Sequence, residues 1–157
     1  MIYASTITYE KGGSEASEVR TVLKVSKGLV WRIEVESPSG CCGLVHVKIL
    51  DGKYQMFPAS IGETIASNGS VIGFDDLYLK TSGPFEFIIV GWNEDTRHSH
   101  KVQVRIGMAS SEAFMSRYMP SLTWEKFHLA MAEAAAKQEA EREAQLALLK
   151  SEIRTDV

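Results

Sequence analysis

Residues 29–36 read Leu-Val-Trp-Arg-Ile-Glu-Val-Glu. Every second side chain of this stretch is hydrophobic, which predicts a single buried face made of Leu29, Trp31, Ile33 and Val35. Most of the side chains between them are charged and would meet water. Such alternation is typical of a β-strand that belongs to a sheet packed on one side only.

The same period of two recurs along the first two thirds of the chain. It is strong at residues 45–49, 54–57, 85–90 and 101–106, and weaker at residues 2–9, 19–25, 63–66, 71–74 and 77–80. Turn residues (Gly, Pro, Asn, Asp and Ser) separate these stretches, and no helical pattern lies between them. Short strands without crossover helices predict a mainly β protein, an antiparallel β-sandwich resembling a jelly roll, with eight or nine strands.

The composition changes near residue 108. All twelve glycines lie at or before Gly107, whereas eight alanines fall between Ala130 and Ala147 among many Glu, Lys, Gln and Leu residues. Because these later residues have high helix propensity, we expect two parts. Residues 1–109 would form the sandwich and residues 110–157 a helical extension, with a short helix at 111–118 and a long helix at about 124–152.

The long helix carries the residues that we expect to mediate assembly. Thr123 suits its N-cap, and a helix of this length exceeds what a lid on a compact sandwich requires. Its bulky and small side chains would pin it to the sandwich and to a neighbouring chain. These residues are Trp124, Phe127, Met131, Ala140, Ala144, Leu146, Leu149 and Ile153.

Charge and hydropathy exclude several classes of protein. The formal charge is 17 − 20 = −3, without clusters of Lys and Arg, which argues against nucleic-acid binding. No apolar run reaches the roughly 18 residues of a membrane span, and the first nine residues lack the features of a signal peptide. We therefore expect a cytoplasmic or virion location. The adjacent pair Cys41-Cys42 is poorly placed for a disulfide, and we expect two free residues.

The most polar stretch, residues 93–100, reads Asn-Glu-Asp-Thr-Arg-His-Ser-His. Its simplest interpretation is a solvated hairpin loop. A second interpretation is a carbohydrate- or surface-binding site formed with the preceding tryptophan, using Trp92, Asn93, Asp95, His98 and His100. A third is a small metal-dependent enzyme, since the two histidines are two residues apart and carboxylates lie nearby.

Other candidate chemistry is weaker. Asp75-Asp76 fits a turn, with a calcium site on the sandwich as the alternative. No nucleophile elbow and no glycine-rich phosphate loop is present. We therefore expect a protein that is not an enzyme and has no cofactor.

Four stretches together carry a resemblance to a known group of proteins: residues 28–36, 43–50, 74–80 and 84–91. Their order of strands and turns resembles that of jelly-roll modules common among structural proteins of tailed bacterial and archaeal viruses. Secreted sugar-binding sandwiches have a similar pattern. The viral resemblance implies a virion accessory protein that forms homo-oligomers or binds other structural proteins, extending a terminus onto its neighbours.

Overall fold

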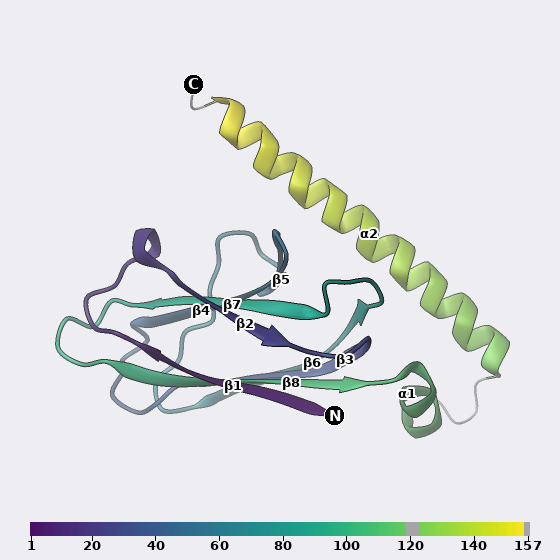
Figure 1. Cartoon of the computed structure of the whole chain (residues 1–157), viewed down its shortest axis with the longest axis horizontal. Coiled ribbons are helices and arrows are strands. Elements are labelled where there is room, and N and C mark those ends of the chain that lie inside the picture. Colours follow the sequence, from purple (N-terminus) through teal and green to yellow (C-terminus); the bar gives the residue numbers. More distant parts are fainter. Residues whose placement is uncertain (119–122, 156–157) are drawn as a thin grey trace. The chain divides into compact units, whose positions relative to one another are not determined.

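The computed structural model describes residues 1–118 and 123–155, with side chains described at 1–117 and 123–150. The chain divides into two compact units, Met1–Met108 and Ala109–Val157 (Figure 1). The first unit contains all the strands and the second contains the two α-helices. Each unit is therefore described by itself.

Eight strands and a single 3₁₀ turn form the described first unit. Their bounds are β1 Ile2–Tyr9, η1 Glu15–Ser17, β2 Val19–Lys24, β3 Gly28–Glu36, β4 Val45–Asp51, β5 Tyr54–Phe57, β6 Val71–Lys80, β7 Glu86–Asn93 and β8 His100–Ala109.

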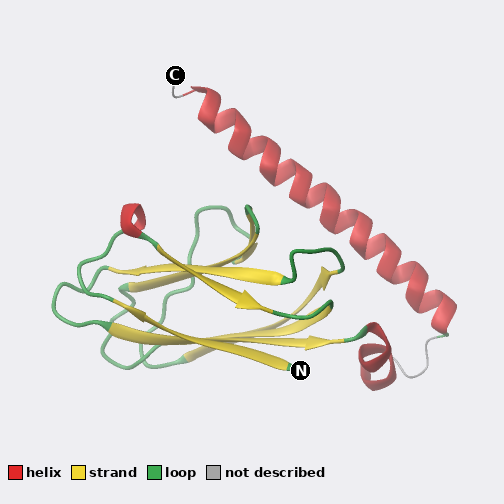
Figure 2. Ribbon diagram, in the orientation of Figure 1, coloured by secondary structure: helices red, strands yellow, loops and turns green. Residues whose placement is uncertain are grey.

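The strands make two four-stranded sheets that face each other (Figure 2). One sheet has the order β1-β8-β3-β6 and the other the order β2-β7-β4-β5. The pairs β1–β8, β3–β6, β2–β7, β4–β5 and β4–β7 are antiparallel. Since chain neighbours such as β1 and β2 lie in different sheets, most pairings join strands distant in sequence. The mainly β, two-sheet antiparallel prediction is confirmed.

The inner faces supply the core, as the period of two predicts. Val45, Val47 and Ile49 of β4 are fully buried, and Val102, Val104 and Ile106 of β8 face them across the sandwich as part of one hydrophobic cluster. Burial of a branched side chain contributes about 1.5–3 kcal/mol, so each of these six side chains stabilises the sandwich.

The prediction for Trp31 is wrong. Ile33 and Val35 belong to the core as predicted. Val30, which precedes Trp31 in the sequence, belongs to the core in its place. The pairing of β3 with β6 shifts register between Val30 and Arg32, where one residue of β3 faces two of β6. This bulge reverses the alternation, so Trp31 lies half-buried on the outer face of the sheet.

Three further predictions need correction. Residues 71–74 and 77–80 belong to one continuous strand, β6, so Asp75-Asp76 lies inside a strand and is not a turn. Residues 63–66 contribute only an isolated bridge, between Ile65 and Val47. The strand predicted at 85–90 begins one residue later and continues to Asn93.

The second unit contains α1 Ser111–Tyr118 and α2 Trp124–Thr155. The latter has 32 residues, about 48 Å at 1.5 Å per residue. It begins directly after the predicted N-cap Thr123, whose carbonyl accepts a bond from the Phe127 amide. Met119 and Pro120, which we expect to end the short helix, lie outside the described residues.

Candidate functional site

The polar stretch between β7 and β8 forms a loop organised by Asp95. One oxygen of this carboxylate accepts hydrogen bonds from the backbone amides of Arg97, at 2.7 Å, and His98, at 3.2 Å. The other oxygen lies 2.8 Å from Nε2 of His100. The amide donors, first that of Arg97, together with the His100 side chain lower the pKa of Asp95 to about 2.

Asn93 completes this network. Its side-chain amide donates to the carbonyl oxygens of His98, at 2.8 Å, and Tyr9, at 3.3 Å, and its oxygen accepts the Asp95 amide. Asn93 is fully buried. These side chains therefore hold the loop in shape, and the burial of Asn93, Asp95 and His100 differs from the solvated loop that is the simplest interpretation of the sequence.

The two histidines of the loop do not act together. His100 is buried beside Asp95, whereas the side chain of His98 is exposed. Among the described residues, no three His, Cys, Asp or Glu side chains are grouped as a metal ion would require. Cys41 is buried, Cys42 is exposed, and both are free thiols.

Trp92 is only 6% exposed. Its indole nitrogen donates to Glu94 at 3.0 Å, and its ring stacks on that of His46 with centroids 5.0 Å apart. The ammonium of Lys48 lies 5.4 Å from the indole centroid. A tryptophan with these neighbours packs against the sheet rather than presenting a flat open face.

A hollow of about 260 Å³ lies beside Trp92 and Asn93. The loop that forms its rim is tied down by two backbone bonds, from Gly12 to the Asp95 carbonyl and from Gly13 to the Asn93 carbonyl. The hollow is lined by Tyr9, Glu10, Lys11, Gly12, Gly13, Ser17, Val19, Trp92 and Asn93. Of the predicted ligand-binding set, the structure thus brings Trp92 and Asn93 to one hollow, and Asp95, His98 and His100 are not part of its lining.

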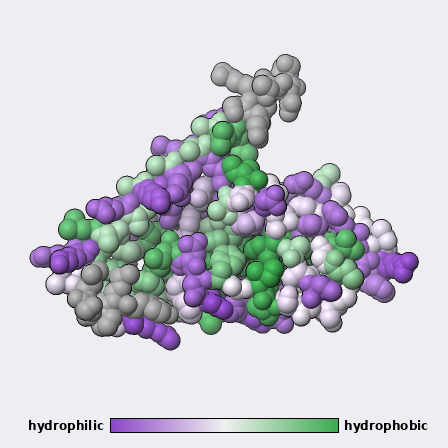
Figure 3. Space-filling view, turned by 180° about the vertical axis from the view of Figure 1, so that it is seen from behind, coloured by the Kyte–Doolittle hydropathy of each residue, from purple (hydrophilic) through white to green (hydrophobic). Residues whose placement is uncertain are grey.

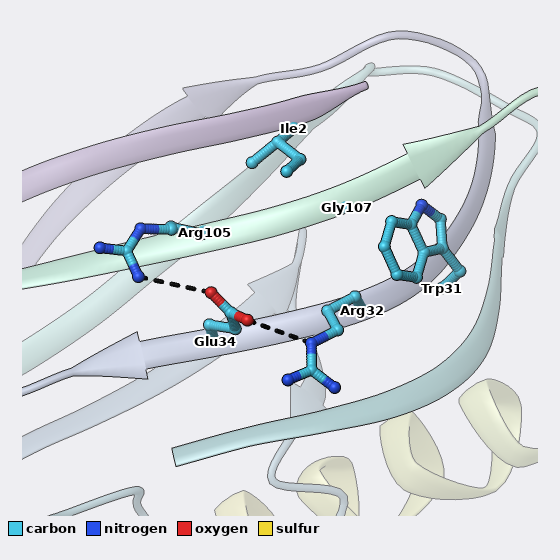
Figure 4. A pocket seen from close by; sticks show the side chains of 6 residues that line it. All are labelled: Ile2, Trp31, Arg32, Glu34, Arg105 and Gly107. Carbon is cyan, nitrogen blue, oxygen red and sulfur yellow. Dashed lines mark hydrogen bonds and ion pairs between the residues drawn. The ribbon is translucent and has the colours of Figure 1, made fainter. Parts of the chain in front are cut away.

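A second hollow, of about 70 Å³, lies on the outer face of the β1-β8-β3-β6 sheet. Figure 4 shows Arg32 and Arg105 reaching Glu34 from opposite sides, at 3.1 and 3.3 Å. Trp31 forms one wall beside Gly107, where a Cβ atom would lie 2.9 Å from the indole. Sequence reasoning missed this site because strict alternation placed Trp31 in the core.

A third cluster, also missed, joins the two sheets through the interior. Asp51 and Lys80 form an ion pair at 2.5 Å, with side chains 5% and 2% exposed. Tyr78 donates from its hydroxyl to the second oxygen of Asp51 at 2.8 Å. The signal was present in the sequence: Asp51 continues the inward series of Val45, and Lys80 shares a strand face with Tyr78.

The predicted assembly residues of α2 divide between two faces. Met131, Leu146 and Leu149 are half-buried, whereas Ala140 and Ala144 are exposed. At about 100° per residue, the two alanines lie roughly 120–180° round the helix from both leucines. The eight residues therefore do not form a single surface.

The remaining members of that set lie near the start of the helix or beyond the described side chains. Phe127 is buried, and the ring of Trp124 lies 5.9 Å from that of Phe127 and 4.4 Å from that of His128. Ile153 belongs to α2 by its backbone, and its side chain is outside the described set.

The exposed alanines belong to a strip with two large apolar side chains, among which the charged Glu133 and Lys137 also lie. Leu129 is 66% exposed and Leu148 is 56% exposed. We call this strip the alanine face; its members are Leu129, Ala136, Ala140, Ala144, Ala147 and Leu148. Figure 3 shows more generally that hydrophobic residues remain at the surface between hydrophilic ones.

No protein-family model matches the chain, and no curated protein matches it. Within the part of the chain that the structure describes, neither helix combines the length and the hydropathy needed to cross a membrane.

Proposed function

We propose that the protein is a non-catalytic structural subunit that self-associates, or docks onto a larger particle such as a virion capsid or tail, through helix α2. The observation that carries this proposal is the alanine face. It leaves Leu129 and Leu148 more than half exposed on a helix of 32 residues. Small residues at spacings of three and four permit close approach of a second helix, and exposed leucines gain free energy when a partner covers them.

The strand order supports the structural part of the proposal. The orders β1-β8-β3-β6 and β2-β7-β4-β5 are compatible with an eight-stranded jelly roll, and the chain changes sheet at every connection except that between β4 and β5. The proposal therefore includes a jelly-roll fold. Jelly rolls occur in capsid proteins and also in lectins, so the fold is compatible with assembly into a particle and with carbohydrate binding.

Charged substitutions on the alanine face test the proposal in the full chain. We expect light scattering to give a mass that is a multiple of 17.4 kDa for the unaltered chain, and a smaller multiple for the double variant Ala140→Glu, Ala144→Glu. Buried like charges oppose close helix packing. The matched control is Ala134→Glu, an exposed alanine about 80–120° round the helix, which should leave the mass unchanged.

Equal masses for the double variant and the unaltered oligomer would contradict the role of the alanine face. A monomeric unaltered chain would remove self-association and restrict the proposal to docking on a foreign particle.

A carbohydrate- or surface-binding module is the second candidate, supported by the hollow beside Trp92 and Asn93. Its rim offers the exposed Lys11 as a donor to a saccharide. We expect a glycan array to give hits that weaken in Lys11→Ala. An array without hits for the unaltered chain would reject this candidate.

A further inference from the structure

The ion pair between Asp51 and Lys80 connects the two sheets. Asp51 is the last residue of β4, and Lys80 is the last residue of β6, which lies in the opposite sheet. Nζ of Lys80 lies 2.5 Å from Oδ1 of Asp51. The hydrophobic interior thus holds a primary amine against a carboxyl group, without any intervening residue.

Aromatic rings surround the pair. Nζ of Lys80 lies 5.4 Å from the centroid of Phe87, and the ring of Tyr78 packs against those of Phe87, at 6.1 Å, and Tyr54, at 6.3 Å. Burial of two charges in such surroundings costs several kcal/mol per ion before their attraction offsets it. Transfer of one proton from the ammonium to the carboxylate removes both charges, and it yields a neutral amine beside a neutral acid. These are the forms that can condense.

We propose that Lys80 and Asp51 become joined by an intramolecular isopeptide bond. The lone pair of Nζ attacks Cγ of Asp51, one carboxyl oxygen leaves with two protons as water, and Nζ retains a single proton as a secondary amide. The overall change is ammonium plus carboxylate to amide plus one water, so no oxidant, reductant or further reactant is needed. Two reacting groups held in contact replace a collision between separate molecules, which favours the condensation.

Tyr78 supplies the electrostatic help that this reaction requires. Its hydroxyl donates to Oδ2 of Asp51 at 2.8 Å, and Oδ2 is the oxygen that remains in the product. Negative charge develops on that oxygen while the tetrahedral intermediate exists, and a donor already in place stabilises it. The product is a covalent link between the sheets.

The intact mass of the purified full chain tests the proposal. We expect a mass one water lower than that calculated from the sequence, and tandem mass spectrometry should show a branched peptide joining residues 51 and 80. Lys80→Arg keeps a buried cation but removes the amine nucleophile, so this variant should have its full calculated mass. Tyr78→Phe should reduce the fraction of linked chains in freshly purified protein.

Two matched comparisons separate the isopeptide from other losses of water. Lys48→Arg alters a half-buried lysine whose ammonium lies 3.3 Å from Glu18, away from Asp51, and this variant should still lose one water. Asp51 is followed by Gly52, a sequence that can form a cyclic succinimide with the same mass change. Water loss that persists in Lys80→Arg would assign the change to the succinimide and overturn the proposal, as would a full calculated mass for the unaltered chain.

Discussion

At the scale of single residues, Asp95 shows how a polar loop is fixed by one carboxylate. It accepts two backbone amides and contacts His100, and its pKa falls to about 2 as a result. Because the pKa of an unfolded Asp is about 3.9, the folded state binds the proton less well. The stability that this group contributes is therefore complete above about pH 4 and is lost as the pH falls through about 2.

The variant Asp95→Asn isolates this contribution. We expect the unaltered chain to have a higher urea midpoint than the variant at pH 5, and the difference to shrink at pH 2, where the carboxyl group is about half protonated in the folded chain and almost fully protonated in the unfolded chain. The measurement is urea unfolding of both proteins at the two pH values. A difference in urea midpoint that does not change with pH would show that the charge of Asp95 contributes nothing to the stability of the fold.

Gly91 lies at a crowded point of the sandwich. A Cβ atom there would lie 2.4 Å from the His46 carbonyl oxygen and 2.7 Å from the Tyr9 ring. Backbone and a buried ring cannot yield easily, so Gly91→Ala should cost roughly 3 kcal/mol of unfolding free energy. Gly43→Ala is the comparison, since Gly43 has open space around it and φ +75°. It should cost about 1–2 kcal/mol. Equal losses in urea denaturation would contradict the crowding at Gly91.

At the scale of strands and helices, the sequence predicts those features that depend only on the local pattern of residues. The alternation in β4 and β8 and the composition of α2 are properties of the segments themselves, and each element forms where its pattern predicts. The position of Trp31 is different, because its bulge depends on the register with β6. That register is a property of two strands together, and the residues of β3 alone do not determine it.

The same reasoning explains which sites could have been found. The alternation of inward-facing side chains in β4 extends to Asp51, and that in β6 extends to Lys80. Only the fold shows that these two strand ends meet. The hollow beside Trp31 depends on Gly107, which is 76 positions away in the sequence. Contacts between strands that are distant along the chain are set by topology, which a single sequence leaves open.

Strand order also predicts which elements open first. The strands β8 and β3 are flanked on both sides in one sheet, as are β7 and β4 in the other, whereas β1, β6, β2 and β5 lie at edges. Hydrogen exchange followed by mass spectrometry should find the slowest amides in the four central strands. Slower exchange in β1 or β2 than in β8 or β7 would indicate that a partner covers a sheet edge.

At the scale of the whole molecule, the two units have different kinds of stability. The first has a continuous core shared by both sheets. The second contains a helix that presents exposed leucines among alanines and charged residues. Helices gain most of their stability from packing of an apolar face, so the proposed assembly would give the exposed leucines of α2 a surface to pack against. A strip of alanines and leucines accepts many helical partners, so the sequence does not predict which chain would cover it.

The most direct test of the assembly proposal is the solution mass of the full chain and of residues 1–119, measured by light scattering at two concentrations. The proposal predicts an oligomer for the full chain and fewer subunits, or a monomer of the β-sandwich, for the truncated chain. The same number of subunits in both would contradict it, because the interface would then lie on the sandwich and not on α2.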